Sequence, residues 1–518
     1  MQIVGTDFNQ LANGDIRPLS WRLDMALEKV SDPDISWFTL DVSTLNGGDI
    51  LGIDGDEIFL PWNYFEYTDY SERLIYQAVS RELEFPYSVV SAIADFQVNN
   101  YDKYFTPHGS SPVAEFILPK RPVRLLQGFG NTVLPQFMGL TSGMPEVDRL
   151  AGTATFTAMD FLTWIYDMPI RNTIAMQNAR TDQVLANIFE QFGLAPSQFD
   201  LARGRNVIPF LFFEREQTTA GDIIRPIMQA EMGMLWLDEQ GIIRFRPRLE
   251  LSEDPVYVFD SDNIVSLDTD GDDTIINHII VNTNVREVQE YQTVYSKSLS
   301  DNTLNVVPAG GTYVMQANLQ DPNLTIQTPT FGENSSVSWF TAEIPNGTPV
   351  TSGVAVSSVE LKTNTYDITF SNTNGFDVNI SQLSLWGQPA KEISVEPTVY
   401  ELRDQDSVDK YEDITYTIDN NFIQSVSQAR SLGQTILNEY SEYADVITIE
   451  VKGNPALQLS DIVDVDYEEH AGLYRIIKIE NKLQDSKFTQ ILKLRLYTDY
   501  EWFQLNVSTL NGTDVLAP

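Results

Sequence analysis

Short segments rich in Val, Ile, Thr and aromatic residues, divided by Gly, Asn, Asp and Pro, run through most of the 518 residues. β-branched and aromatic residues fit a pleated, half-buried surface, and the dividing residues favour turns, so this pattern predicts strands. An apolar share of 42% is enough to bury real cores. At roughly 100–200 residues per domain, the length corresponds to about three to five domains. We therefore predict a mainly β, multi-domain protein.

Three stretches depart from the β pattern. Residues 180–194 have apolar side chains at helical spacing, with Thr181 as the expected N-cap and Gly193 near the C-terminal cap. Residues 218–232 and 427–440 show the same periodicity and predict two further helices.

Two further segments complete the expected organisation. Residues 234–248 alternate around a turn at 238–241 and predict a hairpin, which with the preceding helices makes a small α/β part. Residues 306–395 are dense in Asn, Thr, Ser and Gly and contain short alternating runs. This composition predicts a β-sandwich inserted between two parts of another domain.

Charge and rare residues exclude several functions. The chain has 33 Lys and Arg against 73 Asp and Glu, a net charge of −40, which argues against tight binding to nucleic acid or to anionic membranes. It has no cysteine, so disulfides, thiolate metal sites and a cysteine nucleophile are excluded. The three histidines are His108, His278 and His470, too far apart for a local zinc motif. With no signal peptide or membrane-spanning run visible, we expect a soluble chain made in the cytosol.

No phosphate-binding loop, zinc-protease motif or nucleophile elbow occurs, so we predict no catalytic residues, no metal and no cofactor. The abundant carboxylates leave open a glycosidase that uses an Asp/Glu pair from distant strands. The acidic run 260–273 lacks the closing glutamate of a calcium loop, so we expect a solvated loop, with weak ion binding as the alternative. Four aromatic residues of the inserted segment could stack on sugars but more often fill a sandwich core: Trp339, Phe340, Tyr366 and Trp386.

The two ends of the chain carry the same motif. Residues 37–51 and 502–516 are identical at eleven of fifteen positions, although 465 residues separate them. One interpretation is a duplicated capping hairpin that packs on the chain's own sheets. The other is a pair of equivalent docking elements, and large apolar side chains often dominate the affinity of an interface. The interface residues predicted on this basis are Trp37, Phe38, Leu40, Val42 and Leu45, with Trp502, Phe503, Leu505, Val507 and Leu510.

The order of the segments resembles the tail hub proteins of bacteriophages, also called baseplate hub or minor tail tip proteins. The likeness covers roughly residues 70–500, and Ser460 stands where the family pattern has glycine. It rests on residues 91–107, 123–127, 136–141, 155–160, 233–245, 277–282, 383–389 and 456–464. Many relatives continue into a lysin or a central fibre, whereas this chain stops at Pro518.

The resemblance implies two tail-tube-like β-barrels in each subunit and a homotrimer that closes or adapts a six-fold tail tube. It also implies a DNA conduit, a location at the tail tip of the virion, and no enzymatic activity. The partners implied are a six-fold tail-tube or distal tail protein ring, the tape measure protein, and further tip or fibre proteins. The alternatives are a tail-associated glycan hydrolase and a receptor-binding adhesin that uses the inserted sandwich.

The expected domains follow from these patterns together. They are an N-terminal arm (1–69), a first β-barrel (70–165), a small α/β domain (166–249), a second β-barrel with one helix (250–305 and 396–500), the inserted β-sandwich (306–395) and a C-terminal arm (501–518).

A double substitution tests the end motifs. Trp37→Ala with Trp502→Ala is expected to weaken docking onto the neighbouring ring, because Trp is enriched among residues that dominate interfaces. Either substitution alone is expected to do less, since half of the motifs survive. Co-sedimentation with assembled tail tubes measures docking, and light scattering checks that the oligomer is intact. Full docking of the double variant would contradict the prediction.

Overall fold

The computed structural model describes most of the chain between its two terminal regions. The described residues are 1–2, 4–5, 8, 11–12, 14, 17–27, 66–83, 90–172, 174–213, 218–248, 254–271, 274–283, 286–298, 305–334, 336–362, 365–392, 398–484 and 487–497. Strands make up most of the regular structure, so the predicted mainly β class is confirmed. None of the described helices is long and apolar enough to cross a membrane.

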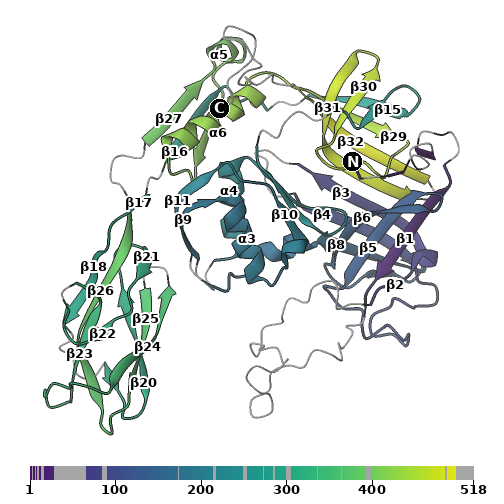
Figure 1. Cartoon of the computed structure of the whole chain (residues 1–518). Coiled ribbons are helices and arrows are strands. Elements are labelled where there is room, and N and C mark those ends of the chain that lie inside the picture. The colour runs from purple at the N-terminus through teal and green to yellow at the C-terminus, as the bar shows by residue number, and fades with distance from the viewer. Residues whose placement is uncertain are drawn as a thin grey trace.

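A 14-stranded sheet forms one end of the molecule (Figure 1). Its first half contains β1 (Leu19–Met25), β2 (Thr68–Asp69), β3 (Leu74–Glu82), β4 (Ala92–Asn99), β5 (Pro122–Phe129), β6 (Thr132–Thr141), β7 (Glu146–Asp148) and β8 (Thr153–Asp160). Its second half contains β14 (Tyr257–Phe259), β15 (Ile264–Gly271), β29 (Asp445–Val451), β30 (Ile462–Tyr467), β31 (His470–Gln484) and β32 (Lys487–Leu496).

Alternation along the strands explains why these segments form a sheet with a core on one face. In β4, Ala92, Ala94, Phe96 and Val98 are buried, while the residues between them are exposed or half-buried. Successive side chains of a strand point to opposite faces, so a period of two puts all four on one face. Phe96 stacks on Phe156 of β8, with ring centroids 5.1 Å apart. Each half of the sheet has a core of its own.

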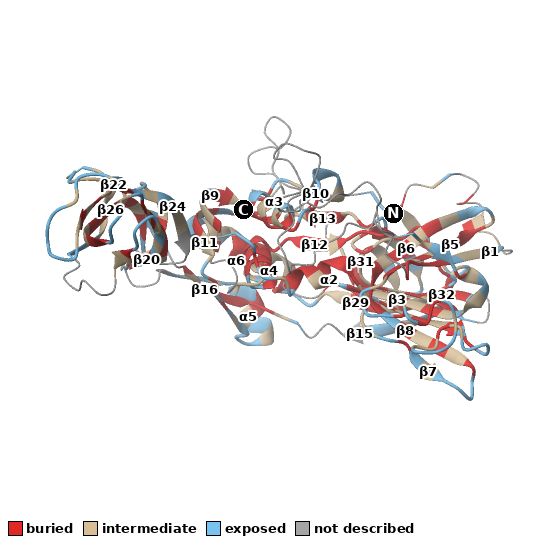
Figure 2. Ribbon diagram, turned by 90° about the horizontal axis from the view of Figure 1, so that it is seen from below, coloured by how far each residue is buried: buried red, intermediate tan, exposed pale blue. Residues whose placement is uncertain are grey.

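The α/β unit lies beside the sheet in the middle of the molecule (Figures 1 and 2). Its elements are α2 (Phe161–Tyr166), β9 (Ile174–Arg180), α3 (Thr181–Gln191), β10 (Phe199–Leu201), β11 (Val207–Phe213), α4 (Ala220–Glu231), β12 (Met234–Leu237) and β13 (Ile243–Arg246). The predicted helices and hairpin are present, with one difference at the start of α3. Arg180 is the N-cap and Thr181 is the first helical residue, because the Thr181 hydroxyl donates to buried Glu231 (2.7 Å) instead of capping the helix.

A second helical unit packs beside α4. It has a three-stranded sheet of β16 (His278–Thr283), β27 (Thr398–Arg403) and β28 (Thr415–Asp419), with α5 (Gln405–Tyr411) and α6 (Val426–Tyr440). Its core includes Ala230 of α4 and Met232, the residue that follows α4. The sequence analysis placed these segments inside the second barrel. In the structure their strands pair with one another and with no strand of the large sheet among the described residues, which is a correction to that boundary.

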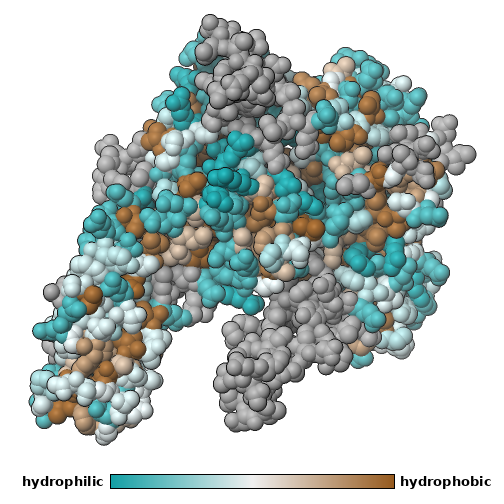
Figure 3. Space-filling view, in the orientation of Figure 1, coloured by the Kyte–Doolittle hydropathy of each residue, from teal (hydrophilic) through white to brown (hydrophobic). Residues whose placement is uncertain are grey.

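The β-sandwich projects away from the large sheet, at the opposite end of the molecule (Figures 1 and 2). One layer contains β17 (Arg286–Val288), β18 (Gln292–Ser298), β19 (Val306–Val307), β21 (Asn323–Ile326), β22 (Thr330–Phe331), β23 (Trp339–Glu343) and β26 (Val378–Glu392). The other contains β20 (Thr312–Asn318), β24 (Val354–Lys362) and β25 (Thr365–Asn372). In Figure 3 the visible face of the sandwich carries many pale residues, in keeping with its Ser- and Thr-rich composition, together with brown, apolar ones.

The sandwich begins earlier than the sequence analysis expected. β17 and β18 lie before residue 306, yet both pair antiparallel with β26. The reason is the length of β26, whose 15 residues offer partners to strands from both sides of the expected boundary. The sequence pattern does not mark this start, because β18 does not alternate and none of its seven residues is buried.

Asp160 connects the first half of the sheet to the α/β unit. Its carboxylate caps α2 by accepting hydrogen bonds from the Thr163 amide (3.0 Å) and the Thr163 hydroxyl (2.9 Å). It also accepts one from the Ala92 amide of β4 (2.6 Å). Burial raises the pKa of Asp160, and these hydrogen bonds oppose the rise.

Asp160→Ala is expected to lower the free energy of unfolding by about 2 kcal/mol or more, because it removes a helix cap and leaves buried donors without acceptors. Chemical unfolding measures the loss. Asp160→Asn serves as a control, since its amide oxygen can still cap α2, and it is expected to lose less. Equal stability of the Ala variant and the unmodified chain would contradict the role of Asp160.

Candidate functional site: the junction between the two halves of the sheet

The two halves of the large sheet share one strand order. In the first half the order is β3-β4-β8-β6-β5-β1, and in the second it is β15-β29-β32-β31-β30-β14. When the short strands β2 and β7 are left out, each strand occupies the same rank along the chain as its counterpart. Pairing is antiparallel at every matching step except the last, where β1–β5 is antiparallel and β14–β30 is parallel. The chain therefore contains two units of matching topology.

One antiparallel strand pair joins the two units. β3 of the first unit runs along β31 of the second, in a register from Tyr76↔Gln484 to Glu82↔Lys478. β31 can serve both units because its 15 residues change neighbour halfway. Its first part pairs with β30 and its last part with β3, while β32 lies along the other side.

A buried ion pair stands at this junction. The guanidinium of Arg81, at the end of β3, donates to the Glu239 carboxylate over 2.7 Å, and the two side chains are 4% and 5% exposed. Arg81 also donates to the Gln136 carbonyl of β6 (2.8 Å). Glu239 comes from the β12–β13 turn of the α/β unit and accepts from Gln458 of the second unit (2.5 Å). The pair therefore binds three units together.

A chain of buried amides extends this network across the sheet. Asn481 of β31 donates to the Gln136 side chain (2.7 Å), and Gln490 of β32 donates to Asn481 (2.7 Å). The Gln136 side chain also donates to the Pro455 carbonyl (2.8 Å). All three amide side chains are at least 97% buried. Satisfied buried networks rigidify the groups they connect, whereas a broken one leaves polar atoms without water or partner.

Within the described residues, four strands of the sheet pair on one side only: β2, β7, β14 and β15. Of these, β15 pairs with β29, and β7 pairs with β8. β15 is the counterpart of β3, which pairs with β31. β6 and then β7 pair along β8, in the same way as the first and the last part of β31 pair along β32. The open edge of β7 is therefore the counterpart of the β31 edge that pairs with β3. The open edges of β15 and β7 thus match the two sides of the internal junction.

The predicted interface residues cannot be compared with the structure. Both end motifs, with Trp37 and Trp502, lie outside the described residues. In the acidic run, Asp260 and Asp262 form a turn and Asp268 lies within β15. No group of three His, Asp or Glu residues suited to a metal occurs in the described part of the chain.

The aromatic residues of the sandwich divide into two kinds. Phe340 and Tyr366 are buried in its core, and Phe340 meets Phe370 edge to face, with centroids 5.0 Å apart. Trp339 and Trp386 are half-buried. The core interpretation therefore holds for two of the four.

The sequence analysis did not single out the residues of the junction. A signal was present in β3, where Gln77, Val79 and Arg81 occupy alternate, buried positions. Two polar residues on the inward face of a strand indicate a buried network or an interface, because buried polar groups require partners. The partners themselves come from segments up to 345 residues away, so no local pattern identifies them.

Three comparisons place the chain among known proteins. No family model matches, and no curated protein matches. Solved structures do match. The 43 kDa tail protein of prophage MuSo2 from Shewanella oneidensis has 10% identity and a TM-score of 0.43, covering 83% of this chain and 95% of that one. A tail protein from Neisseria meningitidis has 9% identity and a TM-score of 0.45, covering 83% and 93%.

A component of the type VI secretion system of E. coli, described as similar to bacteriophage T4 tail proteins, also matches. It has 9% identity and a TM-score of 0.38, covering 82% of this chain and 74% of that one. The matching structures thus include prophage tail proteins and a component of a secretion system. The resemblance stated from the sequence segments is to tail proteins as well.

A double-mutant cycle tests the buried ion pair. Arg81→Met alone is expected to lower the free energy of unfolding by about 3–5 kcal/mol, because it leaves the Glu239 carboxylate buried without its cation. Arg81→Met with Glu239→Leu is expected to lose less than the sum of the single changes. Chemical unfolding of the four proteins gives the coupling energy. A coupling near zero would show that the pair does not hold the units together.

Proposed function

We propose that the chain is a non-enzymatic structural hub at the tip of a bacteriophage tail, acting as a homotrimer that closes or adapts a six-fold tail tube. One observation carries the proposal: each chain holds two units of the same strand order, joined edge to edge. Three such chains present six similar units. A ring of three chains therefore matches a ring of six subunits, and no further type of contact surface is needed.

The internal junction supplies a model for the contact between chains. If β15 of one chain runs along β7 of the next, each contact between chains repeats part of the β3–β31 pairing, because β7 has three residues and the β3–β31 register covers seven. Such a head-to-tail contact generates a closed ring when its rotation is a simple fraction of a turn. The strand β15 is eight residues long, which is comparable to the nine residues of β3.

The charge of the chain supports a conduit for DNA. A wall that attracted phosphates would retain the DNA, whereas a net charge of −40 in each chain opposes tight binding. The proposed partners are a tail-tube or distal tail protein ring, the tape measure protein and further tip or fibre proteins. The two end motifs are proposed to dock onto that ring, which gives six copies for each trimer.

Strand pairing between chains can be tested by cross-linking, because the chain has no cysteine of its own. Cysteine at exposed Ser266 of β15 is combined in turn with cysteine at Glu146, Val147 or Asp148 of β7. The proposal predicts that one combination forms disulfides between chains, because directly opposed residues on adjacent strands have Cβ atoms about 4.5–5.5 Å apart. Mild oxidation followed by non-reducing electrophoresis should yield dimers and trimers and nothing larger.

The matched control places the second cysteine at Ser371 of β25, in the sandwich and away from the sheet. It is expected to stay monomeric on the gel. A ladder that continues beyond trimers, or equal cross-linking in the control, would contradict the closed ring of three. Light scattering of the chain without cysteines, at the same concentration, gives its oligomeric state independently.

A further inference from the structure

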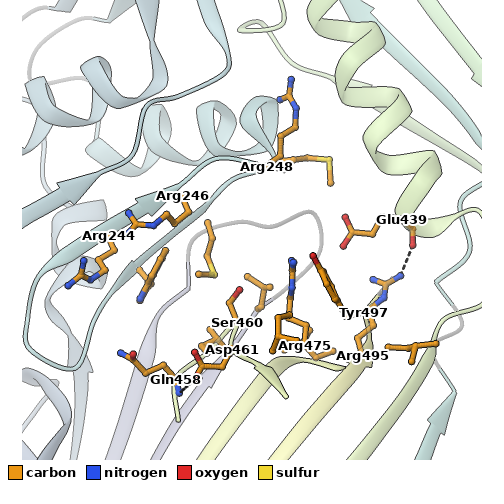
Figure 4. A pocket seen from close by; sticks show the side chains of 18 of the residues that line it. Arg244, Arg246, Arg248, Glu439, Gln458, Ser460, Asp461, Arg475, Arg495 and Tyr497 are labelled. Carbon is orange, nitrogen blue, oxygen red and sulfur yellow. Dashed lines mark hydrogen bonds between the residues drawn. The ribbon is translucent and has the colours of Figure 1, made fainter. Parts of the chain in front are cut away.

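A large cavity lies where the second unit of the sheet, the α/β unit and the end of α6 meet (Figure 4). Its volume is about 1230 Å³, above the range of about 300–1,000 Å³ that is usual for small-molecule sites. Met234, Trp236 and Ile477 contribute apolar wall. The cavity is therefore large enough for a short stretch of peptide and apolar enough to hold its side chains.

The lining is basic although the chain is strongly acidic. Lys and Arg together make up 33 of 518 residues, yet five arginines and the amino terminus face this one cavity against three carboxylates. The arginines are Arg244, Arg246, Arg248, Arg475 and Arg495. Clustering of one charge sign within low-dielectric walls focuses the field on ligands of the opposite sign.

Two of the three carboxylates are already committed to other groups. Asp461 accepts from the Met1 amino terminus over 2.5 Å, and Glu442 pairs with Lys410 over 2.6 Å. The third, Glu439, lies beside Arg475 and Arg495. Burial raises its pKa, and the two guanidinium groups oppose that rise.

Two arginines of the cavity differ in how they are satisfied. Arg244, on β13, pairs with Asp238 (2.7 Å) and Asp200 (2.6 Å). Arg475, on β31, takes part in none of the ion pairs formed by the described residues, and its Nε is buried without a hydrogen-bond partner among them. Its guanidinium lies 5.1 Å from the ring centroid of Tyr497, and the two side chains stand side by side in the cavity (Figure 4).

We propose that this cavity binds an acidic peptide segment of a partner protein, with a carboxylate on the Arg475 guanidinium and an adjacent apolar side chain against Met234 and Trp236. Arginine suits this role because its planar fork matches a carboxylate with two parallel hydrogen bonds. The cation–π contact with Tyr497 helps to hold the guanidinium in place. The inference is independent of the proposed trimer, since all groups involved belong to one chain.

Calorimetric titration of the full chain with two synthetic peptides tests the inference. Acetyl-Glu-Trp-Glu-Leu-amide is expected to bind at least about tenfold more tightly than acetyl-Gln-Trp-Gln-Leu-amide, because each charge-assisted hydrogen bond contributes more than a neutral one. Inorganic phosphate and glutarate are titrated in parallel. If either binds as tightly as the Glu peptide, the site takes bare anions and the peptide assignment is overturned.

Four variants locate the binding. Arg475→Gln is expected to weaken the Glu peptide by about tenfold or more, whereas Glu439→Gln is expected to strengthen it, because a competing negative charge is removed. Arg73→Gln is the matched control, since Arg73 pairs with Asp102 at the far side of the first unit and should leave binding unchanged. If Arg475→Gln lowers the thermal midpoint, Arg475→Lys and Glu439→Gln still decide the question. Equal binding of the two peptides, or no response to either the Arg475 or the Glu439 changes, would overturn the proposal.

Discussion

The buried pair of Arg81 and Glu239 is the interaction on which the arrangement of the units depends. Two charges removed from water cost several kcal/mol each unless attraction and further hydrogen bonds compensate. Here the compensation comes from separate units, through the Gln136 carbonyl and the Gln458 side chain. Displacing any one of these units would leave a buried charge without its partner in an apolar surrounding. Such a pair therefore fixes the relative orientation of the units more than it adds to the net free energy of folding.

The amide chain adds a second constraint at the same place. Gln136, Asn481 and Gln490 belong to strands of both units, so the β3–β31 register is fixed by side chains as well as by backbone pairing. A slip of one residue would turn every side chain of β31 to the other face. The junction therefore has one permitted register. Because the two units have matching topology, the same register would apply where a neighbouring chain pairs with the sheet.

The sequence predicted elements and class better than connections. Periodicity identified α3, α4, α6 and the β12–β13 hairpin, because each depends on residues a few positions apart. It did not separate the sheet of β16, β27 and β28 from the large sheet, because strand pairing over more than 100 residues leaves no local trace. The junction was missed for the same reason, although alternating Gln77 and Arg81 in β3 indicated inward polar groups.

The open edges of β15 and β7 have an electrostatic consequence for assembly. Exposed Asp268 lies on β15, and exposed Glu146 and Asp148 lie on β7, so both edges of the proposed contact are acidic. Charged side chains on an edge strand discourage pairing with unrelated strands. They also make correct pairing slow in dilute salt, because like charges must approach within a Debye length of about 10 Å at 0.1 M. Low ionic strength would then slow ring closure, because newly made chains repel one another until counterions or a nucleating partner screen the edges.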